Sequence, residues 1–210
     1  MSSRDDILAS IRANLPRVDR PLPHVPAFDD EPPASLLSAF KDSLQRMGGM
    51  FLDPPDSGDI LAPARAKIAG AKVVCSTVQE IAGNRDIAGV GAPRDLADVD
   101  FAIVRASFAV AETGSLLLSE TDLHVNAVAY LAQHLIVLLD PADIVVNLHH
   151  AYRRPEFRDR HYASFHTGPS ATADIEGVLI HGAQGVRSLS VLLVARTAGN
   201  PKPPTPEVKS

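Results

Sequence analysis

The chain has 210 residues, of which 45% are apolar and 21% charged, as expected for a globular protein with a substantial core. A net charge of −5 and the lack of a basic stripe argue against nucleic-acid binding. The first ten residues do not have the pattern of a signal peptide, and no apolar run reaches the ~18 residues of a membrane helix, so we expect a cytoplasmic protein.

The N-terminal part of the chain predicts a helix followed by a linker. Residues 3–15 begin with Ser3 as a helix cap and place Ile7, Ile11 and Leu15 on one face. This helix is too short to be stable alone, so we expect it to pack on its own body or on another subunit. Residues 16–33 contain six prolines and should be extended. We therefore predict a helix and linker over 1–33, an α/β domain over 34–197, and a proline-rich tail over 198–210.

The central part alternates between helical and strand patterns. Helices are expected over 35–49, 59–71, 124–133, 141–154 and at least part of 171–182. Strands are expected over 50–53, 72–76, 87–90, 101–110, 134–140, 161–167 and 188–195. This order predicts an α/β fold with a mostly parallel sheet covered by helices on both faces. The only cysteine, Cys75, lies in the apolar run KVVCS and is interpreted as a buried thiol, not a nucleophile.

One segment interrupts the alternation. The sequence FAIVRASFAVAETGSLLLSET contains two apolar runs around Glu112, Thr113 and Gly114, which predicts an inserted β-hairpin. Such a hairpin can border a binding site. Glu112 between apolar runs could act as an acid, a base or a nucleophile, and it could equally be an exposed turn residue.

A second polar segment, FHTGPSATADIE, follows the strand predicted over 161–167. In open α/β sheets, ligands bind at the carboxyl ends of strands, where this loop should lie. Ser170 or Thr172 could cap a following helix whose free amides would bind an anion. Asp174 and Glu176 would repel a phosphate there, and fit a hydroxyl group, a cation or a partner better. An ordinary turn with a capped helix remains the favoured interpretation.

No motif in the chain predicts a metal or nucleotide site. The eight histidines show no HxH, HxxxH or HExxH spacing, so we predict no metal. No GxGxxG or Walker-type loop is present. One cysteine cannot form an intrachain disulfide or ligate an iron–sulfur cluster by itself.

Taken together, FAVAETGSLLLSE, TGPSATADIEGVLIHGAQG and SLSVLLV resemble the lactate-utilisation protein C family of LUD-domain proteins, over roughly residues 35–195. The resemblance implies a three-layer α/β/α fold like that of ribose-phosphate isomerase, glucosamine-phosphate deaminase and coenzyme A transferases. It implies a component of a bacterial system that oxidises L-lactate to pyruvate, in which partner proteins carry the iron–sulfur clusters and this chain binds no cofactor. Gln184 and Val186 depart from the family pattern, which has histidine and proline there.

The resemblance also implies where a ligand would bind. Two segments are expected to face each other across one pocket that holds a small carboxylate. Glu112 would be the catalytic residue, and the binding residues would be Thr113, Gly114, Ser115, Gly168, Pro169, Ser170, Thr172 and Asp174. The chain would be an accessory or substrate-binding subunit. The alternative is a free-standing transferase or isomerase-like enzyme acting on a small acyl or sugar-phosphate substrate, which would need a cation near the pocket.

Overall fold

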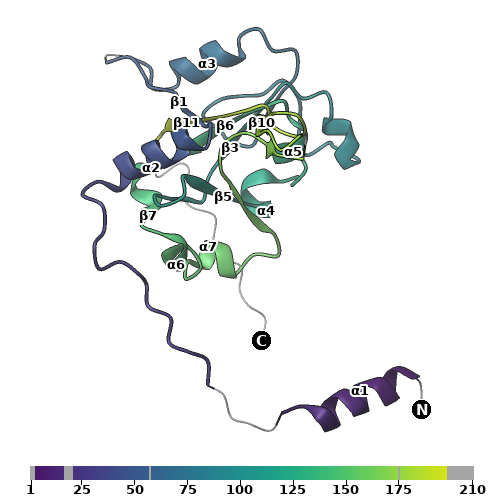
Figure 1. Ribbon diagram of the computed structural model, residues 1–210. Coiled ribbons are helices and arrows are strands. Elements are labelled where there is room, and N and C mark those ends of the chain that lie inside the picture. The colour runs from purple at the N-terminus through teal and green to yellow at the C-terminus, as the bar shows by residue number, and fades with distance from the viewer. Residues whose placement is uncertain (1–2, 17–20, 57, 175, 198–210) are drawn as a thin grey trace.

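A computed structural model describes residues 3–16, 21–56, 58–174 and 176–197. Its centre is a five-stranded sheet in which every neighbouring pair is parallel (Figure 1). In sheet order the strands are β1 (Met50–Phe51), β11 (Ser188–Leu193), β6 (His134–Leu139), β3 (Phe101–Arg105) and β2 (Val74–Ser76). The predicted α/β fold with a mostly parallel sheet is confirmed.

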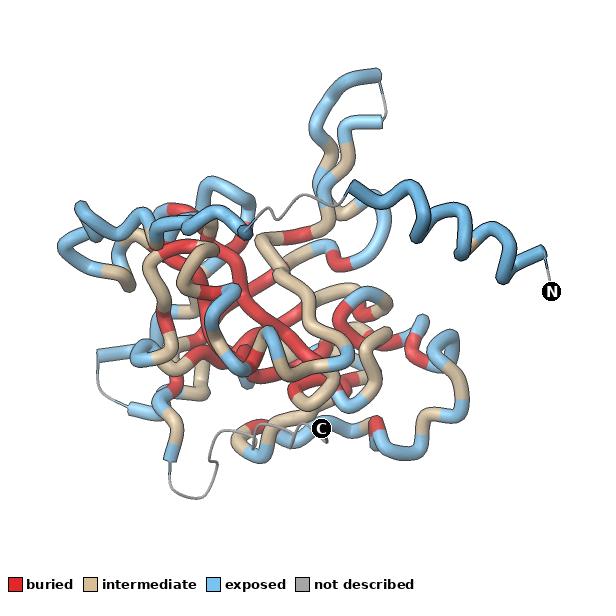
Figure 2. Tube along the Cα trace, turned by 90° about the horizontal axis from the view of Figure 1, so that it is seen from below, coloured by how far each residue is buried: buried red, intermediate tan, exposed pale blue. Residues whose placement is uncertain are grey.

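Helices cover both faces of this sheet because its central strands are apolar on both sides. Along β6, Leu135, Val137 and Leu139 belong to one buried cluster, which includes Phe40 and Leu44 of α2 (Leu36–Arg46). The alternate residues of β6 belong to a second cluster, which includes Ala64 of α3 (Ala62–Ile68). The buried residues therefore run through the middle of the molecule along the strands, as Figure 2 shows.

The predicted hairpin is present and belongs to a second sheet. Strand β4 (Phe108–Val110) pairs antiparallel with β5 (Ser115–Ser119) around the turn at 111–114. Strands β8 (Ala163–His166) and β7 (Ile144–Val145) extend this sheet, in the order β7-β4-β5-β8. The strand expected over 101–110 is thus two strands in two sheets, because the chain leaves the central sheet after Arg105.

Three predicted elements are wrong. The helix expected within 171–182 is replaced by an antiparallel pair, β9 (Ala171–Thr172) and β10 (Ile180–His181), and the positive φ angles of Glu176 and Gly177 do not fit a helix. The helix expected over 141–154 is divided, because the β-branched pair in β7 joins the second sheet. In its place lie η2 (Pro141–Asp143), β7 and α6 (Leu148–Ala151), followed by α7 (Pro155–Arg158). No strand forms at 87–90, which precedes η1 (Pro93–Leu96).

The remaining helices agree with prediction in place, although they are shorter. Helix α1 (Ser3–Asn14) forms near the N-terminus and buries none of its residues, so Ile7, Ile11 and Leu15 are exposed. The helix expected over 124–133 is α5 (Val128–Leu131), preceded by α4 (Glu120–Leu123). The predicted tail over 198–210 lies outside the described residues. Within the described ranges, none of the helices is long and apolar enough to cross a bilayer.

Candidate functional site

The two glycine-bearing segments singled out in the sequence contact the C-terminal part of α2 and the turn directly after it. Gly114 and Gly168 each have φ +71°, a conformation that favours glycine. A Cβ atom on Gly114 would lie 2.6 Å from Cα of Leu44, and one on Gly168 would lie 3.0 Å from the carbonyl carbon of Met47. Both contacts are with backbone atoms, so neither position has room for a side chain. These distant segments therefore approach neighbouring positions at the end of α2 and directly after it.

A chain of hydroxyl groups joins the two segments directly. The Thr113 and Ser115 hydroxyls are 2.7 Å apart, and the Ser115 hydroxyl lies 2.6 Å from that of Thr167. Ser115 is buried, so its hydroxyl is satisfied inside the protein. Thr113 and Ser115 thus fix the turn of the hairpin against the end of β8.

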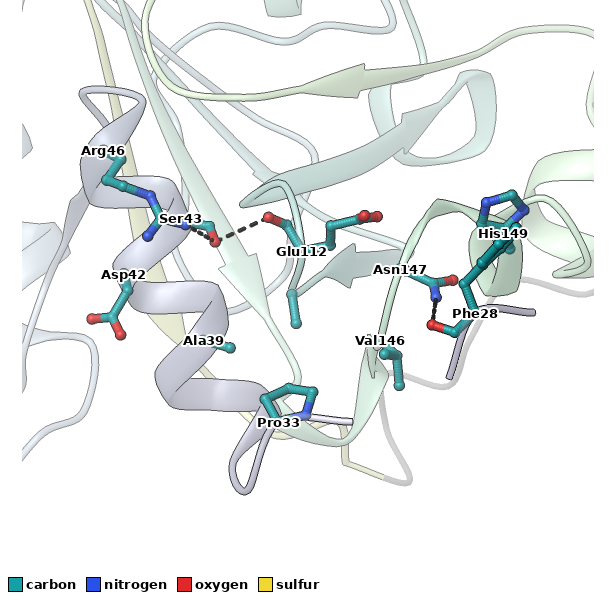
Figure 3. Close-up of a pocket in the computed structure, with 11 residues that line it drawn as sticks. Phe28, Pro33, Ala39, Asp42, Ser43, Arg46, Glu112, Val146, Asn147 and His149 are labelled. Atoms are coloured by element: carbon teal, nitrogen blue, oxygen red, sulfur yellow. Dashed lines mark hydrogen bonds between the residues drawn. The ribbon is translucent and has the colours of Figure 1, made fainter. Parts of the chain in front are cut away.

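The larger of two cavities near these segments has a volume of about 620 Å³ and lies beside Glu112 (Figure 3). Helix α2 forms one wall, the end of β4 another, and residues 146–149 a third. Part of the N-terminal linker closes it. Its lining residues are Phe28, Pro33, Ala39, Asp42, Ser43, Arg46, Ala111, Glu112, Val146, Asn147 and His149.

Glu112 is exposed to this cavity and held by its backbone. Its N–H donates to the carbonyl of Val146 (3.0 Å), and its carbonyl accepts from the Ser43 hydroxyl (3.1 Å). The carboxylate oxygen Oε2 accepts from the backbone N–H of Leu148 (3.2 Å) at the start of α6. Of the two interpretations of Glu112, the exposed turn residue describes its surroundings better, although the carboxylate does face a cavity.

Arg46 supplies a positive charge to the same cavity. Its guanidinium donates to the Ser43 hydroxyl (2.9 Å), the group that also contacts the Glu112 carbonyl. In the part of the chain that the structure describes, Arg46 makes no ion pair with a carboxylate. The cavity therefore presents a cation from α2, while Glu112 and Asp42 contribute carboxylates.

Residues 25–33, which we call the arm, were predicted only as linker, yet they are anchored to the body. Asn147 donates through Nδ2 to the carbonyls of Ala27 (2.7 Å) and Phe28 (3.1 Å). The Phe28 ring lies 4.7 Å from that of His149, and Asp29 lies 3.1 Å from Nε2 of His150. Phe28 is the only Phe, Tyr or Trp among residues 16–33, and this was the one sequence signal that the segment packs. The arm thus completes the cavity.

A second cavity, of about 230 Å³, lies at the loop after β8. Gly168, Pro169 and Ser170 line it, whereas Glu112 lines only the first of the two cavities. Thr172 and Asp174 line neither, and instead bond to each other in the exposed hairpin, with Asp174 N–H 3.3 Å from the Thr172 hydroxyl. The expectation that all these residues surround one pocket therefore needs correction, because the segments meet through the hydroxyls of Ser115 and Thr167 and do not share a cavity.

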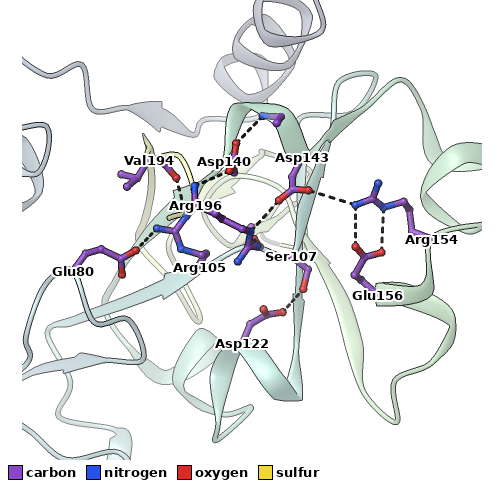
Figure 4. Close-up of polar contacts among 12 residues, drawn as sticks. Glu80, Arg105, Ser107, Asp122, Asp140, Asp143, Arg154, Glu156, Val194 and Arg196 are labelled. Atoms are coloured by element: carbon purple, nitrogen blue, oxygen red, sulfur yellow. Dashed lines mark hydrogen bonds and ion pairs between the residues drawn. The ribbon is translucent and has the colours of Figure 1, made fainter. Parts of the chain in front are cut away.

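The carboxyl ends of the central strands, where we expected a ligand, carry a network of charged groups (Figure 4). Arg105 at the end of β3 is 5% exposed, donates to the carbonyl of Val194 (2.8 Å) and pairs with Glu80. Arg196 donates to Asp140 and Asp143. These charges are paired with one another inside the protein.

Burial shifts the pKa of two other groups in the core. Asp122 accepts from the hydroxyls of Ser107 and Ser119, and burial raises its pKa above the usual value for aspartate. Burial also raises the pKa of Cys75, which is 1% exposed, and the interpretation of a buried thiol is confirmed. Among the described residues, no three of His, Cys, Asp and Glu are grouped as a metal site.

The comparison with known families agrees with this architecture, because the model of the LUD domain matches residues 60–194. The chain belongs to the LUD domain family. A crystal structure of a DUF162 family protein from Deinococcus radiodurans at 1.70 Å has the same fold, with a TM-score of 0.56 and 16% identity, over 82% of this chain and all of that one. No curated protein matches the sequence. The LUD domain supplies Glu112 and residues 146–149 to the first cavity, while α2 and the arm precede the matched region.

Proposed function

We propose that the protein is a ligand-binding subunit of an L-lactate utilisation system and binds a small 2-hydroxycarboxylate in the cavity beside Glu112. Membership of the LUD family supports the lactate context. The observation that carries the choice of ligand is that one cavity combines the guanidinium of Arg46 with the carboxylate of Glu112.

These two groups match the two ends of a 2-hydroxycarboxylate. Arg46 binds the ligand carboxylate, since guanidinium–carboxylate pairs are strong and directional. Glu112 accepts a hydrogen bond from the C2 hydroxyl, and Ala39 and Val146 contact the apolar end of the ligand. The Ser43 hydroxyl bonds to both Arg46 and the Glu112 carbonyl, and so links the guanidinium to the backbone at Glu112.

Oxidation of lactate to pyruvate removes two electrons and two protons, so the system needs an electron acceptor. The sequence has one cysteine, too few to ligate an iron–sulfur cluster. In our proposal, iron–sulfur partner proteins take the electrons and this chain presents the substrate to them. No cofactor is assigned to the chain itself.

The alternative of a transferase or isomerase acting on a sugar-phosphate or acyl substrate lacks a suitable cation at the carboxyl ends of the central strands, where such a fold would place its substrate. Such an enzyme needs a positive charge that is free to bind phosphate or coenzyme A. Arg105 at the sheet edge is committed to Glu80 and to the carbonyl of Val194. We therefore retain the binding subunit as the proposed function.

The first test is calorimetric titration of the full chain with L-lactate and with propionate, which lacks the hydroxyl. We expect lactate to bind about tenfold more tightly than propionate, and Glu112→Gln to reduce that preference, because one charge-assisted hydrogen bond is lost. Arg46→Gln should weaken both ligands, whereas Arg12→Gln, an exposed change on α1, should weaken neither.

The second test adds cysteine-rich companion proteins and measures lactate-dependent reduction of a dye. The rate should depend on this chain and fall in the Glu112→Gln and Arg46→Gln variants. The proposal would be refuted if lactate did not bind and the rate of dye reduction were the same with and without this chain.

A further inference from the structure

The second cavity has a chemistry that differs from that of the first. It lies between α5, β8 and two glycine-containing loops, and no Asp, Glu, Lys or Arg lines it. Its lining residues are Ala129, Tyr130, Phe165, His166, Thr167, Gly168, Pro169, Ser170, Gly185 and Val186. A charged ligand would find no opposite charge among these side chains, and burying it there would be unfavourable.

A network of neutral polar groups fixes one side of this cavity. Nε2 of His166 lies 2.9 Å from the Ser164 hydroxyl, which lies 2.9 Å from the hydroxyl of Tyr130. The hydroxyl of Tyr162 bonds to that of Tyr130. These contacts orient the imidazole, because one ring nitrogen is committed to Ser164.

Two polar atoms at the cavity remain available. Among the described residues, neither Nδ1 of His166 nor the hydroxyl of Ser170 takes part in a hydrogen bond. Burial lowers the pKa of His166 to about 4, so the imidazole is neutral near pH 7. A neutral imidazole and a hydroxyl can each donate or accept a hydrogen bond to a neutral ligand.

We propose that this cavity is a second binding site, which takes a small uncharged ring compound through His166 and Ser170. The rings of Tyr130 and His166, 5.2 Å apart, provide aromatic surface for a planar ligand. Ala129, Pro169 and Val186 add apolar contacts. A volume of about 230 Å³ limits the ligand to roughly the size of one ring with a substituent.

This site is independent of the proposed lactate site, because the two cavities have no lining residue in common. Gly185, at φ +74°, lines the second cavity, and a Cβ there would lie 3.5 Å from Cβ of Ser170. The loop carrying Gly185 therefore approaches Ser170 closely enough to close the second cavity.

Nicotinamide and nicotinate are suitable probes, because they share a ring and differ in charge. Binding to the full chain can be followed by NMR through the imidazole signals of His166 and by calorimetry. We expect nicotinamide to bind at least tenfold more tightly than nicotinate near pH 7. His166→Phe, which keeps a ring but removes Nδ1, and Ser170→Ala should each weaken nicotinamide about tenfold. His161→Phe, at an exposed position, is the matched control and should have no effect.

Three results would overturn the proposal. The first is that nicotinamide and nicotinate bind with equal affinity. The second is that nicotinamide binds both variants as tightly as the unmodified chain. The third is that nicotinamide does not bind at its highest soluble concentration. Should His166→Phe fail to fold, Ser170→Ala alone decides, because a hydroxyl with no internal partner can be removed without loss of structure. L-lactate titrations of the folded variants should match the unmodified chain, which separates this site from the first.

Discussion

Gly114→Ala tests the central packing contact of the molecule, between the hairpin turn and α2. Gly114 has φ +71°, and an alanine there would be strained by about 1–2 kcal/mol. Its Cβ would also lie 2.6 Å from Cα of Leu44 and 2.7 Å from the carbonyl carbon of Ser43, both backbone atoms of α2. Because backbone cannot rotate away as a side chain does, α2 must shift, at a further cost of about 1–3 kcal/mol.

The summed destabilisation is about 2–5 kcal/mol, a large share of the ~5–15 kcal/mol by which domains are stable. For a domain of this size it corresponds to a decrease in Tm of about 5–15 °C. Thermal unfolding followed by circular dichroism measures it, and urea unfolding gives the free energy directly.

Gly177→Ala is the matched control for this prediction. Gly177 has the same φ of +71°, but a Cβ there would have no atom within 4 Å. Gly177→Ala introduces only the backbone strain, which is ~1–2 kcal/mol. We therefore expect its Tm to decrease by only about 2–6 °C. Equal decreases in the two variants would show that the contact between Gly114 and α2 does not contribute to stability.

Three further changes test other contacts. Because the pKa of His166 falls from 6.5 to about 4 on folding, the unfolded state binds more protons between these values and stability decreases as the pH is lowered through this range. Urea unfolding at pH 7 and near pH 4.5 measures the loss of unfolding free energy on acidification. This loss should be about 1–3 kcal/mol smaller in His166→Phe than in the unmodified chain. Asn147→Ala removes the hydrogen-bond donor to the arm and the N-cap of α6, so it should lower the free energy of unfolding by about 1–3 kcal/mol. It should also make the arm sensitive to limited proteolysis. Unchanged cleavage would contradict the anchoring of the arm. Arg105→Met removes the ion pair with Glu80 at the end of β3 and should cost about 2–4 kcal/mol in urea unfolding, whereas an unaltered midpoint would show that this pair is neutral for stability.

The central strands could be predicted from sequence because their pattern is local. HLIVLL and SLSVLL are largely apolar runs with the length of strands, and such runs occur where both faces of a sheet are covered. The hairpin was likewise marked by a glycine between two apolar runs. These signals depend on no distant residue.

The elements that were wrongly predicted depend on partners far away in the chain. Residues 144–145 form a strand because they pair with Ala109 and Val110, and this pairing prevents the continuous helix expected over 141–154. Residues 171–172 pair with 180–181 across a turn whose left-handed residues a helix cannot include. The extended arm was predicted, but its anchoring was not, because its carbonyls accept from Asn147 about 120 residues later.

The two glycine segments suggested a shared pocket, and the structure gives them a different role. Each glycine lets a turn approach another backbone segment closely, one at Leu44 in α2 and the other at Met47 directly after this helix. Helix α2 is thereby held from both segments, and it supplies Arg46 and Ser43 to the first cavity while the loop after β8 forms the second. Since α2 precedes the matched LUD domain, the domain's glycines fix an element that the family match does not include. The arrangement of the first cavity therefore depends on a packing contact. If the proposed function holds, a variant that shifts α2 should weaken lactate binding even when every residue that touches the ligand is intact.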